Sequence, residues 1–133
     1  MKLEHMKAGV KMSTNLTVLL PDRPGAIAEV GEALGAAGVN IEGISAFVVN
    51  GQAFGHLLVD DGVMARRALD GIADVAAEGL ALVVEVEDRP GAFGRLTRQV
   101  ASRGVNLKFI YLATNTRVVL GADDLDGALA AVS

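Results

Sequence analysis

Two short segments of the chain have an apolar residue at every second position, and they lie 66 residues apart. A period of two places every second side chain on the same face, which is typical of a half-buried β-strand. The pattern therefore predicts the same strand twice. The residues predicted to face inward are Leu16, Val18 and Leu20 in the first segment and Leu82, Val84 and Val86 in the second.

A helical pattern follows each of these strands. Apolar residues recur at positions i, i+3 and i+7, which places them on one face of a helix. Pro24 and Pro90 suit the first helical turn, because a proline there gives up no hydrogen bond. Gly38 and Gly104 are typical of the left-handed residue that follows a helix. The predicted inward residues are Ile27, Val30 and Leu34 in the first helix and Phe93, Leu96 and Val100 in the second.

The remainder of each copy predicts a hairpin and a second helix. Asn50-Gly51 is a hairpin signal, and the acidic pair Asp60-Asp61 precedes a helical pattern. The resulting order, β-α-β-β-α-β, indicates an α+β fold in which one antiparallel sheet carries both helices on one face. The remaining strands are expected at 41–49, 54–59 and 73–79 in the first copy and at 107–113 and 118–120 in the second.

Two fragments recur at the same offset of 66 residues. Asp22-Arg23-Pro24-Gly25-Ala26 returns as Asp88-Arg89-Pro90-Gly91-Ala92. Gly38-Val39-Asn40-Ile41 returns as Gly104-Val105-Asn106-Leu107. A repeat with this long a period indicates a duplicated folding unit.

The repeat divides the chain into two units, 14–79 and 80–133. Each is close to the lower size limit for independent folding, so we expect them to share a core or a sheet. The second unit ends directly after its second helix and has no room for a fourth strand. Its first strand is therefore expected to have an open edge, covered by another segment of the chain or by a second subunit. Residues 1–13 are interpreted as a tag or a disordered N-terminus.

Composition narrows the class of protein. Apolar residues make up 51% of the 133 residues and aromatic residues 4%, so the core must consist of Val, Leu, Ile and Ala. The net charge of −4 argues against a role on nucleic acid or on an anionic membrane surface. The absence of cysteine removes disulfides and thiolate chemistry. No apolar run reaches the roughly 20 residues of a membrane span, and we expect a cytoplasmic protein.

With these elements in place, the two fragments resemble the ACT domain family. The resemblance rests on a strand, then Asp-Arg-Pro-Gly-Ala opening a helix, then Gly-Val-Asn entering the next strand, and it covers about residues 14–133. It implies two tandem ferredoxin-like ACT units with no catalytic domain attached. The missing last strand and the shorter hairpin of the second unit depart from the family pattern.

The resemblance also implies where a ligand binds. ACT domains sense small molecules, usually amino acids, where the loop before the first helix meets the second strand of a neighbouring domain. The implied loop residues are Asp22, Arg23, Pro24, Gly25 and Ala26, and Asp88, Arg89, Pro90, Gly91 and Ala92. The implied strand residues are Asn40 and Ile41, and Asn106 and Leu107.

The chemistry of these residues suits a zwitterion. Gly25 and Gly91 allow a ligand close to the backbone at a helix start, where free N–H groups attract a carboxylate. The aspartates of the loops can accept from an α-ammonium group, and the asparagines offer both a donor and an acceptor. An alternative is that each loop is only a turn before a helix, because Asp, Pro and Gly all favour turns.

Candidate catalytic and metal chemistry is sparse. His56 has no partner residue that would complete a metal site, and no serine has a His–Asp setting. The leading hypothesis is a regulatory protein that binds an amino acid, needs no cofactor, forms a homodimer and signals to a protein partner. The alternatives are an oligomerisation or adaptor module without a ligand and, third, an enzyme.

The two copies differ in charge. The first helix of unit one carries Glu29 and Glu32, whereas its counterpart carries Arg95, Arg98 and Arg103. Such charges often serve only solubility, but opposite signs on equivalent helices can also favour pairing of the two kinds of unit. Because the strands diverge as well, we expect the two ligand sites to have unequal affinities.

Overall fold

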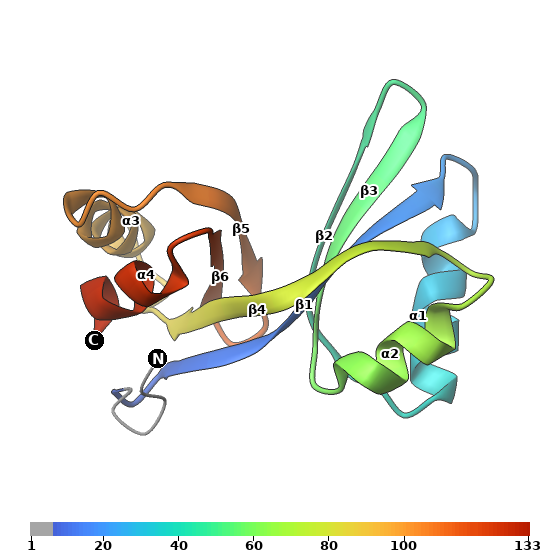
Figure 1. Ribbon diagram of the computed structural model, residues 1–133, viewed down its shortest axis with the longest axis horizontal. Coiled ribbons are helices and arrows are strands. Elements are labelled where there is room, and N and C mark those ends of the chain that lie inside the picture. Colours follow the sequence, from blue (N-terminus) through green and yellow to red (C-terminus); the bar gives the residue numbers. More distant parts are fainter. Residues whose placement is uncertain (1–6) are drawn as a thin grey trace. The chain divides into compact units, whose positions relative to one another are not determined.

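The computed structural model of the protein describes residues 7–133. Within this range the chain forms four helices and six strands (Figure 1). Contacts divide it into two compact units, Thr14–Gly79 and a second that joins Leu80–Ser133 with the N-terminal segment ending at Ser13. The elements are β1 (Val10–Pro21), α1 (Ala26–Ala36), β2 (Ile41–Val49), β3 (Gln52–Val59), α2 (Gly62–Leu69), β4 (Asp74–Glu85), α3 (Ala92–Ser102), β5 (Leu107–Ala113), β6 (Arg117–Ala122) and α4 (Leu125–Val132).

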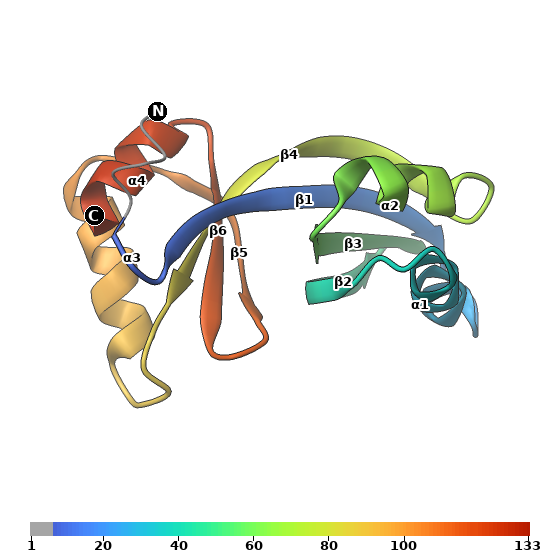
Figure 2. The ribbon, with the colours of Figure 1, turned by 90° about the horizontal axis from the view of Figure 1, so that it is seen from below.

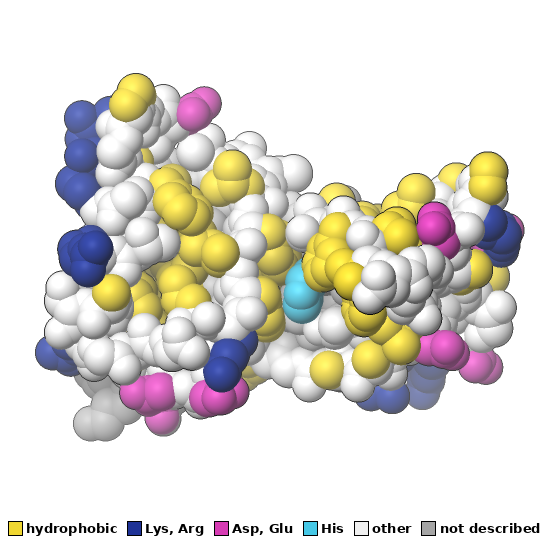
Figure 3. Space-filling view, turned by 90° about the horizontal axis from the view of Figure 1, so that it is seen from above, with side chains coloured by type: hydrophobic (Ala, Val, Ile, Leu, Met, Phe, Trp, Pro, Cys, Tyr) yellow, Lys and Arg dark blue, Asp and Glu magenta, His cyan; other side chains and the backbone are white. Residues whose placement is uncertain are grey.

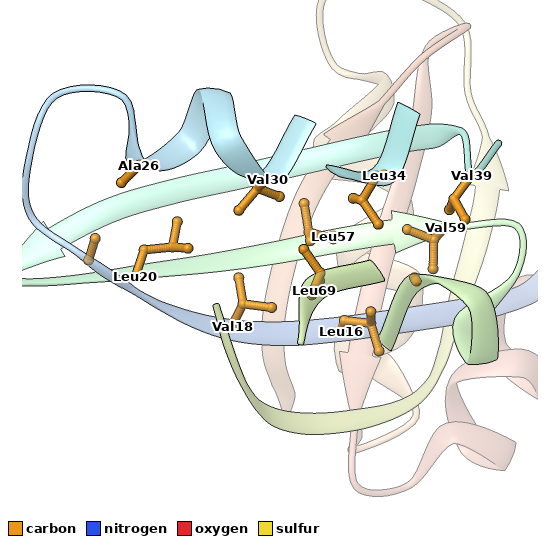
Figure 4. Packing of buried hydrophobic residues seen from close by; sticks show 12 residues of the cluster. Leu16, Val18, Leu20, Ala26, Val30, Leu34, Val39, Leu57, Val59 and Leu69 are labelled. Atoms are coloured by element: carbon orange, nitrogen blue, oxygen red, sulfur yellow. The ribbon is translucent and has the colours of Figure 1, made fainter. Parts of the chain in front are cut away.

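The first unit is an antiparallel sheet covered by two helices. β3 pairs with β1 on one side and with β2 on the other, and Leu16 and Leu57 lie opposite each other. Side chains from α1 and α2 join those of β1 and β3 in one apolar cluster, so both helices cover the same face (Figure 4). The buried members are Leu16, Val18, Leu20, Ala26, Val30, Leu34, Val39, Ala53, Leu57, Val59, Ala65 and Leu69.

The second unit repeats this arrangement. β6 pairs antiparallel with β4 and with β5, and α3 and α4 contribute to one apolar cluster with these strands. A register shift between Leu107 and Phe109 in β5 matches the one between Ile41 and Gly43 in β2, so both units carry a bulge at the same position. The buried members of the cluster are Val10, Leu82, Val84, Leu96, Val100, Val105, Val118, Leu120, Ala128, Leu129 and Val132.

Two predicted strands are one continuous strand. The fourth strand expected at 73–79 and the strand expected around Leu82 together form β4, and the boundary between the two units falls inside it. The prediction of separate strands was wrong because Gly79 and Leu80 continue the extended backbone without a turn.

The N-terminal segment covers the edge that the sequence predicts to be open. The backbone N–H of Glu85 in β4 donates to the carbonyl of Gly9 at 2.8 Å. β1 and β4 lie side by side in both ribbon views (Figures 1 and 2). Val10 is buried in the core of the second unit, and Met12 packs against that core.

For residues 10–13 this arrangement differs from the prediction of a disordered N-terminus over residues 1–13. Residues 10–13 form the start of β1, since Val10 and Met12 alternate with polar residues at the period of a strand. Residues 1–6 lie outside the described residues.

The inward face of each first helix is rotated from the predicted one. Ile27 and Phe93 are 45% and 47% exposed, whereas Val30 and Leu34 are fully buried. Ala26, four residues before Val30, takes the inward position because the helix begins there. Stripes at i, i+3, i+7 and at i, i+4, i+8 share most of their members, so the sequence pattern alone does not distinguish them.

Candidate functional site

Both Asp-Arg-Pro-Gly-Ala loops form the same turn. The N–H of Ala26 donates to the carbonyl of Arg23 at 3.3 Å, and Gly25 has φ 87° and ψ −10°. The second loop repeats this with Ala92 and Arg89 at 3.3 Å, and with Gly91 at φ 90° and ψ −17°. Proline followed by a glycine at positive φ is the pattern of a type II turn. The recurring glycine therefore has a backbone cause that is independent of any ligand.

The turns lead into helices that no side chain caps. Gly25 and Gly91 are the N-cap residues of α1 and α3, and neither helix start has a side-chain hydrogen bond. In α2 and α4, by contrast, the carboxylates of Asp61 and Asp124 accept from backbone N–H groups at 3.0 and 2.9 Å. Uncapped N–H groups at a helix start can bind a carboxylate. The type II turns thus present two anion-accepting backbone segments.

The prolines lie before the helices, whereas the sequence predicts them in the first helical turns. Pro24 and Pro90 precede the N-cap glycines and therefore lie outside the first helical turn. The physical reason is that proline fixes the φ of the second turn residue. The helix starts only after the glycine.

In the first loop an internal ion pair neutralises the arginine. Nη2 of Arg23 donates to Oε2 of Glu29 at 2.7 Å, and both side chains are exposed. Hydrogen bonding to Glu29 and the charge of that carboxylate raise the pKa of Arg23. The guanidinium also donates to the carbonyl of Pro24 at 3.3 Å, so it is folded back over its own loop.

The second loop has a different charge pattern. Arg89 pairs with Glu87, which precedes the loop, and the helix position equivalent to Glu29 is Arg95. A Cβ on Gly91 would lie 2.8 Å from Nη1 of Arg95, so the absence of a side chain there makes room for this guanidinium. The second helix start therefore has an additional cation where the first has an acid.

The asparagines follow a helix-ending motif that recurs in both units. Gly38 and Gly104 have φ 75° and 74°, which confirms the predicted left-handed residue. The N–H groups of Val39 and Val105 reach back to the carbonyls of Leu34 and Val100 at 2.9 and 3.4 Å. With Gly38 donating to Gly35 and Gly104 to Ala101, these are Schellman motifs, so the glycine and valine recur for structural reasons.

The strand residues of the predicted site differ in exposure. Asn40 and Asn106 are exposed, whereas Ile41 and Leu107 pack against the edges of the two cores. The backbone N–H of Asn40 donates to Oδ1 of Asp60 at 3.3 Å, which fixes where β2 begins.

Within one unit, the loop and the asparagine lie at opposite ends of a helix. Figure 4 shows Ala26 and Val39 at the two ends of α1, with Val30 and Leu34 between them. A helix of 11 residues is about 16 Å long. A single unit therefore does not bring Asp22–Ala26 together with Asn40 and Ile41.

The second unit shows the same separation as two distinct grooves. A groove of about 470 Å³ is lined by Asn106 and Leu107 together with α3. A larger groove of about 800 Å³ lies between α3 and α4 and is lined by Arg89 and Ala92 of the loop. Arg98 is shared by both grooves.

Sequence reasoning missed two residues of the loop environment. Glu87 binds Arg89, and Arg95 lies over Gly91. The signal was present in the repeat, since aligning the copies at the 66-residue offset places Arg95 opposite Glu29. From the sequence alone, this difference in charge predicts pairing between units and does not place a charge beside the loop.

Metal chemistry is not evident among the described residues. They contain no group of three or more His, Cys, Asp or Glu side chains that could hold a metal ion. No helix in the described part of the chain is long and apolar enough to cross a membrane.

Comparison with known proteins shows what part of the chain is similar to a known family. Residues 14–66 match the sequence family described as the ACT domain. This segment therefore resembles the ACT domain, a family of regulatory modules that bind small molecules. A search of curated protein sequences found no match.

Solved structures share the fold over nearly the whole chain. A protein of Bacteroides thetaiotaomicron aligns with a TM-score of 0.74 and 21% identity, covering 94% of this chain and 89% of that one. The aspartate kinase regulatory subunit of Thermus thermophilus aligns with a TM-score of 0.67 and 22% identity, covering 94% of this chain and 95% of that one. The aspartate kinase regulatory subunit of Thermus flavus aligns with a TM-score of 0.61 and 21% identity, covering 96% of each chain. At these identities the likeness establishes the fold.

Proposed function

We propose that this protein is a regulatory subunit or module that binds an amino acid at its Asp-Arg-Pro-Gly-Ala loops and passes the signal to a protein partner. The observation that carries the proposal is the pair of uncapped helix starts, each opened by a type II turn with an arginine beside it. The ACT domain at 14–66 supports a small-molecule ligand. Two neighbours in fold are regulatory subunits, which supports the regulatory role.

In this proposal the ligand carboxylate accepts from backbone N–H groups at the start of α1 or α3. Asp22 or Asp88 accepts from the α-ammonium group. Asn40 or Asn106, supplied by a neighbouring unit, completes the site, because a single unit holds loop and asparagine about 16 Å apart. A homodimer provides such a neighbour. Catalysis forms no part of the proposal.

A second candidate function is an oligomerisation or adaptor module. The observation that favours it is an apolar strip on β2, where Phe47 and Val49 share one face of the strand and are 51% and 48% exposed. Phe47 stacks on Phe54 of β3 with ring centroids 5.6 Å apart, which enlarges this surface. Exposed apolar patches often mark protein contacts.

A thermal-shift screen against the standard amino acids distinguishes the two functions. A ligand present at 100 times its dissociation constant adds about 2.7 kcal/mol to the stability of the native state. The sensor is expected to give a shift of several degrees with one or a few amino acids. An adaptor without a ligand is expected to give none.

Paired variants locate the site. Asp22→Asn and Asp88→Asn each remove a carboxylate proposed to bind the ammonium group, and both residues are exposed. Asp126→Asn is the matched control, since Asp126 is an exposed acid in the first turn of α4, outside both loops. The proposal is wrong if the ligand-induced shift survives in the Asp22→Asn/Asp88→Asn double variant.

A further inference from the structure

The groove between α3 and α4 of the second unit has an apolar floor and a basic rim. Ala92 and Leu96 of α3 and Ala130 and Ala131 of α4 provide the apolar lining of this cavity of about 800 Å³. The basic lining residues are Arg89, Arg95, Arg98 and Arg103. In the space-filling view, Lys and Arg side chains gather along the outer margin of this unit, at the left (Figure 3).

Most of this positive charge is uncompensated. Among the described residues, Arg95, Arg98 and Arg103 are exposed and form no ion pair with a carboxylate. Glu87 is the one acidic residue that the described chain contributes to the groove lining, and it is paired with Arg89. The rim therefore has three guanidinium groups available to an external anion.

The fold does not require this charge. At the 66-residue offset, Arg95 and Arg98 correspond to Glu29 and Glu32, so the same helix in the first unit carries the opposite sign at both positions. The first unit as a whole has 9 acidic and 3 basic residues between 14 and 79. Against a chain of net charge −4, the basic rim is a local feature of the second unit.

The spacing of the arginines indicates the size of the occupant. They run from the loop before α3 to Arg103 directly after it, so the rim extends over the length of this helix of 11 residues, about 16 Å. A compact anion can reach only part of such a row. A polypeptide with several carboxylates can follow the whole of it, and guanidinium groups bind carboxylates in a bidentate manner.

We propose that the α3–α4 groove binds an acidic segment of a partner protein, with carboxylates on the arginine rim and small apolar side chains on the Leu96–Ala130–Ala131 floor. This assigns a surface to the partner in the proposed function and rests on that function for its regulatory meaning. The binding itself does not require an amino acid. The two proposals can therefore fail separately.

The test uses fluorescence anisotropy with the full chain and a labelled peptide of alternating Glu and Ala, about 11 residues long to match the helix. The double variant Arg95→Gln/Arg98→Gln is expected to weaken binding about tenfold or more. Arg66→Gln/Arg67→Gln is the matched control, since it removes two exposed arginines from α2 of the first unit and should change affinity less than about twofold. Circular dichroism and thermal unfolding verify that each variant is folded.

Three outcomes overturn the proposal. The first is that the peptide does not bind, or that it binds by non-specific charge attraction, which would be seen if both double variants weakened its affinity equally. The second is displacement of the peptide by inorganic pyrophosphate at micromolar concentration, which assigns the groove to a small anion. The third is a change in oligomeric state of Arg95→Gln/Arg98→Gln by sedimentation without any peptide binding, which assigns it to a second copy of the chain.

Discussion

Arg23 and Glu29 form an ion pair of 2.7 Å across the turn that opens α1, and the second unit replaces this acid by Arg95. The same type II turn therefore presents a compensated arginine in one unit and an additional cation in the other. Identical backbone geometry with different charge is the structural basis for expecting two unequal ligand sites.

The ion pair is expected to restrain Arg23 from binding a ligand carboxylate. Glu29→Gln should therefore increase the affinity of the first loop for its amino acid, by about two- to tenfold, while thermal stability changes little because the pair is exposed. Glu32→Gln removes the same charge one turn further along α1 and is the control. Equal affinities of the two variants, measured by calorimetry, would show that the ion pair does not influence the loop.

The positive φ of Gly25 predicts a cost for any side chain at that position. Gly25→Ala should lower the free energy of unfolding by about 1–2 kcal/mol, because a Cβ is disfavoured in the left-handed region. Gly31→Ala is a control for which the opposite effect on stability is expected. Gly31 lies within α1 and has open space where a Cβ would lie, so alanine there should stabilise by about 0.5–1 kcal/mol. Urea unfolding of both variants measures whether each substitution lowers or raises the free energy of unfolding.

The N-terminal strand is expected to contribute to the stability of the second unit. Val10→Ala should lower the free energy of unfolding by about 1–2 kcal/mol, since Val10 is 7% exposed and lies in the core with Leu82 and Val84. Lys7→Ala, at an exposed position just before the strand, should have almost no effect. If the two variants unfold at the same denaturant concentration, the segment does not pack as described.

His56 predicts a loss of stability on mild acidification. Burial lowers its pKa below the ordinary value of 6.5, and its Nδ1 lies 3.3 Å from Oγ1 of Thr17. The unfolded chain then takes up the proton more readily than the native protein, so the contribution of His56 is complete above about pH 6.5 and is lost as the pH falls below that value. Urea unfolding at about pH 7.5 and pH 5.5 should show a smaller pH effect in His56→Gln than in the wild type. An equal pH effect in both proteins would refute this assignment.

Local structure was largely predictable from the repeat. Gly38 and Gly104 end their helices as expected, because a left-handed residue strongly favours glycine. The recurring Arg-Pro-Gly likewise marks one turn in both units. These features depend on a few neighbouring residues, and a short sequence specifies them.

Non-local features were not predictable in the same way. Val10 contacts a core whose other members begin at Leu82, and no local pattern identifies so distant a partner. The position of the Arg95 guanidinium over Gly91 depends on side-chain conformation, which the repeat does not encode. The candidate loops were therefore located from sequence, whereas their charge environment required the structure.

The most direct test of the central claim is isothermal titration calorimetry with the amino acid that produces the largest thermal shift. The account predicts binding to two classes of site with unequal affinity, of which Asp22→Asn removes one and Asp88→Asn the other. Binding of no amino acid, or a titration that the double variant leaves unchanged, would contradict the assignment of these loops as an amino-acid sensor.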